Sequence, residues 1–68
     1  MTDKKIGKKL HKIRKSRELT QEWVSKRAKM HRQSYGAIEL GERKCTVVEL
    51  ILLCEIMAYD VRMFFHEF

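Results

Sequence analysis

Residues 19–43 read LTQEWVSKRAKMHRQSYGAIELGER and contain the clearest signals for helix starts and ends in the chain. Thr20 is a good N-cap, and the residues that follow it predict a short helix ending near Ala28. A turn at residues 29–30 leads into another helix over about residues 31–40. Gly41 then suits a left-handed C-cap, a conformation that glycine adopts without strain. The sequence therefore predicts two short helices joined by a tight turn, over about residues 20–40.

The second of these helices carries side chains suited to reading base edges. Tyr35 and Ile38 share its inner face. Its outer face is predicted to hold Arg32, Gln33, Ser34 and Ala37. Arginine can pair bidentately with guanine, glutamine can do so with adenine, and alanine can touch a thymine methyl group. This pattern favours insertion of the helix into the major groove of DNA.

Three more helices are expected outside this unit. Ile6, Leu10 and Ile13 have helical spacing and predict an amphipathic helix over residues 3–16. Residues 46–49 read TVVE, a capping box that starts a helix running to about residue 57. Asp60 caps a final short helix. With no Pro and only three Gly in 68 residues, we expect one compact all-α domain with five helices.

The helix over residues 46–57 has two apolar stripes. One stripe is expected to face the core and comprises Val47, Leu50, Leu53, Cys54 and Met57. The other comprises Val48, Ile51, Leu52 and Ile56. A small monomer seldom needs both stripes. Together with Phe64, Phe65 and Phe68 in the tail, the second stripe predicts a homodimer whose pairing and core helices lie at about residues 46–66.

Charge is divided unevenly along the chain. The net charge is +6, but residues 1–45 hold 14 of the 15 Lys and Arg and 5 of the 9 Asp and Glu. The rest of the chain is slightly acidic and apolar. A basic front and an apolar back indicate a polyanion on one side and packing on the other.

Several other classes of protein are disfavoured. His11, His31 and His66 are isolated, without a nucleophile, a base or a metal ligand at useful spacing, so neither an enzyme nor a metal site nor a cofactor is expected. No run of about 18 apolar residues predicts a membrane span. Cys45 and Cys54 have no CxxC partner, and we expect free thiols in a reducing, cytoplasmic setting.

The chain resembles the lambda-repressor/Cro-like (XRE-type) helix-turn-helix family over about residues 6–65. The resemblance is carried by IG at 6–7, Leu10, IR at 13–14, LTQEWVS at 19–25 and MHRQSYGAIELGER at 30–43. Around His31, Gly36 and Glu39 the sequence is most similar to the controller proteins of restriction–modification systems. The resemblance implies a transcriptional regulator that binds a palindromic operator as a homodimer in the cytoplasm, at the nucleoid. RNA polymerase is a further candidate partner.

Roles of single residues follow from the resemblance. Gln21 is expected to bond a DNA phosphate through its side chain or its main-chain amide. Arg43 and Lys44 are expected to be phosphate contacts after the reading helix. Arg14 and Glu39 match positions that in this family often form a partly buried ion pair, so we expect them to be structural.

Departures from the family pattern affect the base contacts more than the fold. Lys29 stands where the turn usually has Gly, His31 replaces the usual Ser or Thr cap, and Gly36 interrupts the reading helix. A second hypothesis also stays open. The protein could be an antitoxin or an adaptor whose apolar C-terminal surface binds another protein.

Overall fold

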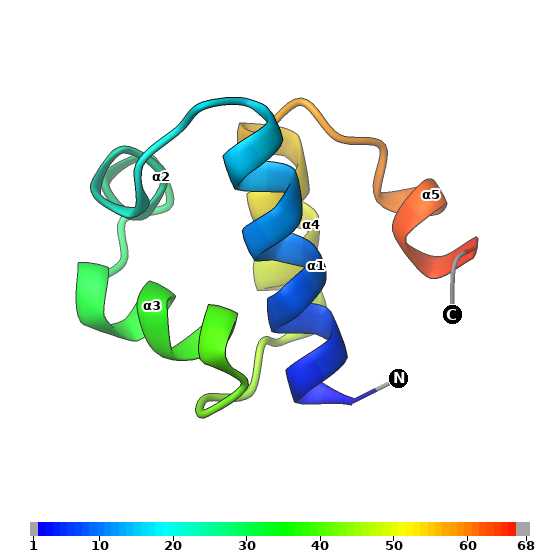
Figure 1. Ribbon diagram of the computed structural model, residues 1–68, viewed down its shortest axis with the longest axis horizontal. Helices are drawn as coiled ribbons and strands as arrows, with labels where there is room; N and C mark the ends of the chain where they lie inside the picture. Colours follow the sequence, from blue (N-terminus) through cyan, green and yellow to red (C-terminus); the bar gives the residue numbers. More distant parts are fainter. Residues whose placement is uncertain (1, 67–68) are drawn as a thin grey trace.

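The computed structural model describes residues 2–66, which form five α-helices and no strand. The helices are α1 (Asp3–Ser16), α2 (Gln21–Arg27), α3 (Arg32–Leu40), α4 (Val47–Ile56) and α5 (Val61–His66). In Figure 1, α1 lies in front of α4, with α2 and α3 on one side of this pair and α5 on the other. The all-α prediction is confirmed, and Phe68 lies outside the described residues.

Capping residues explain where the helices begin. Thr2 accepts a hydrogen bond from the main-chain N–H of Lys5, and Thr20 does the same for Trp23. Thr46 and Glu49 form the predicted capping box, each side chain accepting from the other residue's main-chain N–H. Each cap satisfies donors that the first turn of a helix leaves without an acceptor.

The first four helices end in the same way, with a residue in the left-handed conformation followed by a 6→1 main-chain hydrogen bond. At the end of α3 this residue is Gly41, with a φ of 76°, and Glu42 N–H bonds the carbonyl of Ala37. The equivalent residues after α1, α2 and α4 are not glycine. They are Glu18, Lys29 and Ala58, with φ between 55° and 56°. Lys29 therefore takes the left-handed conformation at the position where the turn usually has Gly, and non-glycine residues take it at two other helix ends.

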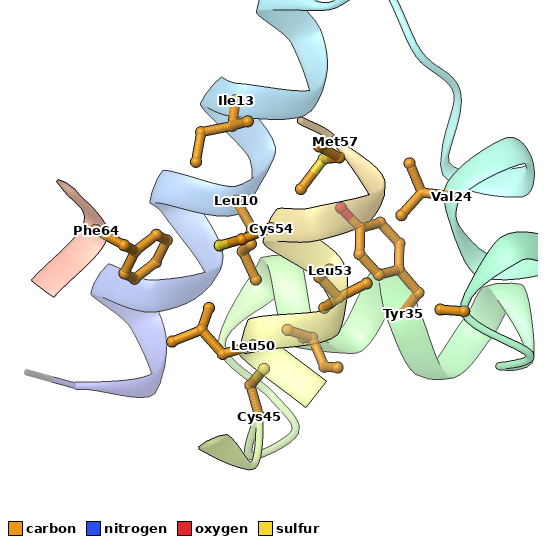
Figure 2. Packing of buried hydrophobic residues seen from close by; sticks show 12 residues of the cluster. Leu10, Ile13, Val24, Tyr35, Cys45, Leu50, Leu53, Cys54, Met57 and Phe64 are labelled. Carbon is orange, nitrogen blue, oxygen red and sulfur yellow. The ribbon is translucent and has the colours of Figure 1, made fainter. Parts of the chain in front are cut away.

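Side chains from all five helices meet in one core (Figure 2). The largest fully buried side chains are Tyr35, Phe64, Leu10, Ile38, Leu53, Met57, Val24 and Cys54. Cys45 and Cys54 are free, as expected, and burial raises the pKa of each thiol to about 11. Both thiols are therefore protonated and unreactive at neutral pH.

Two predictions about the apolar residues are wrong. Phe64, assigned to the dimer interface, is fully buried in the core because α5 folds back and inserts this ring beside α1 and α4 (Figure 2). Val47, assigned to the inner stripe of α4, is exposed because it is the first residue of the helix. The outer stripe remains as predicted for Val48, Ile51 and Leu52.

Gly7 allows α1 to lie directly on α3. A Cβ atom at this position would stand 2.1 Å from the main-chain oxygen of Ile38 and 2.5 Å from that of Glu39. No real side chain tolerates such distances, so any larger residue would push α1 away from α3. The close approach brings the basic face of α1 next to the outer face of α3.

Candidate nucleic-acid interface

The outer face of α3 carries the predicted reading residues. Arg32 and Gln33 are exposed at the start of the helix, and Ser34 and Ala37 are partly exposed. His31 occupies the N-cap position without a side-chain capping bond, so the departure from Ser or Thr leaves the first turn uncapped by a side chain. The first turn of α3 thus presents main-chain N–H groups and two long polar side chains to solvent.

Arg14 and Glu39 form an ion pair between α1 and α3. Arg14 donates from Nε to Glu39 Oε2 at 2.7 Å and from Nη2 to Oε1 at 3.3 Å. A third bond runs from Arg14 Nη1 to the carbonyl of Leu19 at 2.7 Å, in the segment that leads to α2. The Glu39 side chain is only 2% exposed. The pair therefore fixes α3 against both α1 and the approach to α2.

Glu39 also accepts hydrogen bonds from two residues that sequence reasoning did not connect to it. Gln21 donates from Nε2 to Oε1 at 2.9 Å, and His11 Nδ1 lies 3.0 Å from the same oxygen. Burial alone would raise the pKa of Glu39, but the bonds from Arg14, His11 and Gln21 outweigh it and lower the pKa to about 2. Glu39 is thus an ionised acceptor that joins the three helices α1, α2 and α3.

The side chain of Gln21 is turned inward by this bond. Its Oε1 lies beside Gly36, where a Cβ atom would be 3.4 Å away. The main-chain N–H groups of the first turn of α2 stay without an acceptor inside the helix and point out of its N-terminus. The bond to Glu39 uses one of the two N–H groups of Nε2, so the second N–H and the main-chain amide are both left for the expected phosphate contact.

Arg43 has a protein partner that the sequence did not reveal. Its Nη1 donates to Glu49 Oε1 at 3.1 Å, and its Nη2 donates to Oε2 at 2.9 Å. Glu49 is the residue of the capping box at the start of α4, so the pair ties the α3–α4 loop to that helix. Arg43 stays partly exposed, and the neighbouring Lys44 is exposed. No local pattern marks this pair, because its members are six apart across a loop.

An open groove of about 970 Å³ runs between α1 and α3. One wall carries Arg32, Gln33, Ala37 and Leu40 from α3, and the other carries Lys4, Lys5, Lys8 and His11 from α1. Gln21 and Glu39 also line it. The predicted base-reading residues thus share a single concave surface with lysines of α1.

The opposite side of the molecule is apolar. Val48 is 75% exposed, Ile51 44% and Phe65 42%, and Leu52 is exposed as well. Ile56, the remaining member of the predicted surface, is only partly exposed and packs against the core. Val47 and Met63, which sequence reasoning did not place here, add further exposed apolar area on α4 and α5. We call Val47, Val48, Ile51, Leu52, Met63 and Phe65 the apolar face.

The arrangement of α2 and α3, with a tight turn between them and an exposed polar α3, defines a helix-turn-helix domain. A family model described as helix-turn-helix matches residues 10–64, so the chain belongs to the helix-turn-helix family, of the XRE type that includes the lambda repressor and Cro. A comparison with curated proteins found no match. The family is a DNA-binding and non-enzymatic one, which supports a DNA-binding regulator with double-stranded DNA as its partner.

Within residues 2–66 no helix has the length and apolar content needed to cross a bilayer. In the same residues no three His, Cys, Asp or Glu side chains gather where they could hold a metal ion.

Proposed function

We propose that this protein is a sequence-specific transcriptional regulator that binds a palindromic operator as a homodimer. The observation that carries the proposal is the outer face of α3, where Arg32 and Gln33 stand exposed beside a groove lined with lysines. In helix-turn-helix proteins the corresponding helix enters the major groove. Arg32 and Gln33 then read base edges by bidentate hydrogen bonds, and Ser34 and Ala37 make shorter contacts further along the helix.

Phosphate contacts hold the domain in register on the duplex. We assign these to the main-chain amide of Gln21 and to Arg43 and Lys44. Three of the five N–H groups of Arg43 donate to Glu49 and to the carbonyl of Lys44. Two N–H groups are left for a phosphate, so Arg43 can contact DNA and keep its bonds to Glu49. Glu49 thereby orients the guanidinium group.

The apolar face supports the homodimer. It contains six exposed apolar side chains on α4 and α5, two helices that contact each other, and exposed apolar residues gathered in this way often mark an interaction site. Both α3 helices must lie on the same side of the dimer to meet one duplex, so we propose a two-fold axis that runs between the two α4 helices and brings them there. Their spacing then sets the separation of two half-sites, expected to be about one helical turn of DNA.

The biological setting follows from the resemblance alone. It suggests a restriction–modification controller protein or a repressor from a phage or another mobile element. We place it at the nucleoid in the cytoplasm, with RNA polymerase as a further partner during regulation. In the alternative, the apolar face binds a different protein, as in an antitoxin or an adaptor.

Two measurements test the proposal. Titration of a fluorescent duplex at increasing salt should give a logarithmic slope of about −0.9 for each neutralised phosphate. Sedimentation of the protein alone and with DNA should show a dimer and a complex of two chains for each duplex. Absence of duplex binding at low salt would refute the DNA reading, and a monomer at high micromolar concentration would refute the homodimer.

A further inference from the structure

His11 lies on the wall of the groove that faces α3. Its side chain is 52% exposed, and it shares the groove with Arg32 and Gln33. One side of the imidazole ring is held from within the protein, because Nδ1 lies 3.0 Å from Glu39 Oε1. Neither the sequence nor membership of the family assigns this residue a role.

The bond to Glu39 decides which ring nitrogen carries the hydrogen. Glu39 is ionised, as its low pKa requires, and a carboxylate can only accept. Nδ1 must therefore be the donor. Arg14 Nη2 lies 3.3 Å from the same nitrogen, but it finds no lone pair there once Nδ1 is protonated. Nε2 is left as the variable site, and it makes no hydrogen bond within the described residues.

The charges around the ring favour an anion in the groove. The cations that line the groove or touch the ring are Lys4, Lys5 and Lys8 of α1, Arg14 of α1 and Arg32 of α3. The acids are Glu39, which Arg14 neutralises, and Glu42 at the end of the groove. Gln21 contributes the side chain that α2 presents here and carries no charge. The balance is positive beside the helix that we propose reads DNA.

We propose that His11 is a phosphate-binding residue: its imidazole takes up a proton at Nε2, keeps it, and donates a hydrogen bond from Nε2 to a DNA backbone phosphate while Nδ1 donates to Glu39. This inference rests on the proposed function, because it needs α3 in the major groove and a DNA strand running between α1 and α3. It adds a contact from α1 to those assigned to α2, α3 and the α3–α4 loop. The lysines of the groove wall lie along the same strand.

The proposal has a signature that a purely structural histidine lacks. Histidine changes charge between about pH 5 and pH 8, and an adjacent anion favours its charged form. Binding to DNA therefore takes up protons, and affinity rises as the pH falls. By linkage, the association constant can increase up to about tenfold per pH unit for each protomer that gains a proton on binding.

The test measures the affinity for one duplex at about pH 8 and about pH 6, at constant ionic strength, for three proteins. The wild type should bind more tightly at the lower pH. In His11→Gln, which keeps a donor for Glu39, most of this pH dependence should disappear. His31→Gln is the matched control, because His31 is exposed at the start of α3, and it should keep the wild-type pH dependence.

A fourth variant guards against a loss caused by misfolding. His11→Lys keeps a cation at all these pH values, so it should bind at about pH 8 with an affinity near that of the wild type at about pH 6. The proposal is overturned if His11→Gln folds by circular dichroism and keeps the full pH dependence, or if His31→Gln removes it. Wild type that binds no duplex would refute the proposed function as well, whereas salt-dependent binding with no effect of His11 would refute this inference alone.

Discussion

The front and back of this small domain are built on different chemistry. At the front, α1, α2 and α3 converge on one buried carboxylate, Glu39, which accepts hydrogen bonds from Arg14, His11 and Gln21. At the back, α4 and α5 leave six large apolar side chains in contact with solvent. The position of α3 is thus fixed by contacts within one chain. The apolar face, in contrast, lies open to solvent, and we propose that a second copy covers it.

The largest effect on stability is expected at Glu39, the residue that joins α1, α2 and α3. Glu39→Ala strands Arg14 inside the domain and should lower the free energy of unfolding by about 3–5 kcal/mol, measured by urea denaturation. The double variant Arg14→Met/Glu39→Leu removes both charges and should recover most of this loss. A loss below about 1 kcal/mol for Glu39→Ala would show that the carboxylate does not organise the front.

Acid should also destabilise the domain, because it protonates Glu39. The pKa of Glu39 in the folded protein is about 2, below its ordinary value of 4.5. A lowered pKa contributes stability that is fully present above 4.5 and is lost as the pH falls toward 2. Thermal unfolding between these pH values should show a falling midpoint, and the double variant should show a shallower fall. Equal slopes for both proteins would contradict the assignment.

A charged residue in the apolar face should weaken the proposed dimer and leave the fold intact. Ile51→Lys places a charge in the middle of the apolar face and should weaken the proposed dimer by at least about 2 kcal/mol, or roughly thirtyfold in Kd. His31→Lys adds the same charge at an exposed position at the start of α3, away from the apolar face, and should leave the dimer unchanged. Sedimentation equilibrium separates the two results. An unaffected dimer in Ile51→Lys would place the contact elsewhere.

For the residues proposed to contact DNA, a loss of sequence preference should be distinguishable from a loss of affinity for all sequences. Arg32→Ala and Gln33→Ala should each cost about 1–3 kcal/mol on the preferred duplex and flatten the preference at particular bases. Lys44→Ala should weaken binding to all sequences alike and lower the salt slope by about one unit. Competition assays with operator and random duplexes measure both. Equal losses on the two duplexes for all three variants would refute this division of roles.

The smallest effect concerns the helix ends. Ala58 follows α4 with a φ of 56°, so Ala58→Gly should raise stability by up to about 1 kcal/mol through relief of strain. Ala37→Gly, inside α3, should instead lower stability by about 0.5–1 kcal/mol. Urea denaturation compares the pair. A loss in both variants would mean that the left-handed turn carries no relievable strain.

The elements could be predicted from local sequence because their boundaries depend on local chemistry. Thr20, Gly41 and the capping box of Thr46 and Glu49 act within four residues of their own positions, and each stands where the sequence placed it. The pattern of apolar residues likewise located most of the core. These signals do not depend on how the helices pack.

The remaining features depend on packing between elements. Phe64 was predicted to lie in the dimer interface, but the return of α5 toward α1 and α4 buries its ring in the core (Figure 2). The contacts of Glu39 with Gln21 and His11 span 18 and 28 residues, and no pattern in the chain marks them. His11 precedes Arg14 by three residues on α1, so the two side chains lie on the same face of the helix. This spacing is the one local sign that both face α3.

The most direct test of the central claim is selection of bound sequences from a random pool of duplex DNA. The account predicts enrichment of one motif with two inverted half-sites, about one helical turn apart, and loss of the enriched bases when Arg32 or Gln33 is replaced. Recovery of unrelated sequences without a shared or symmetric motif would contradict it.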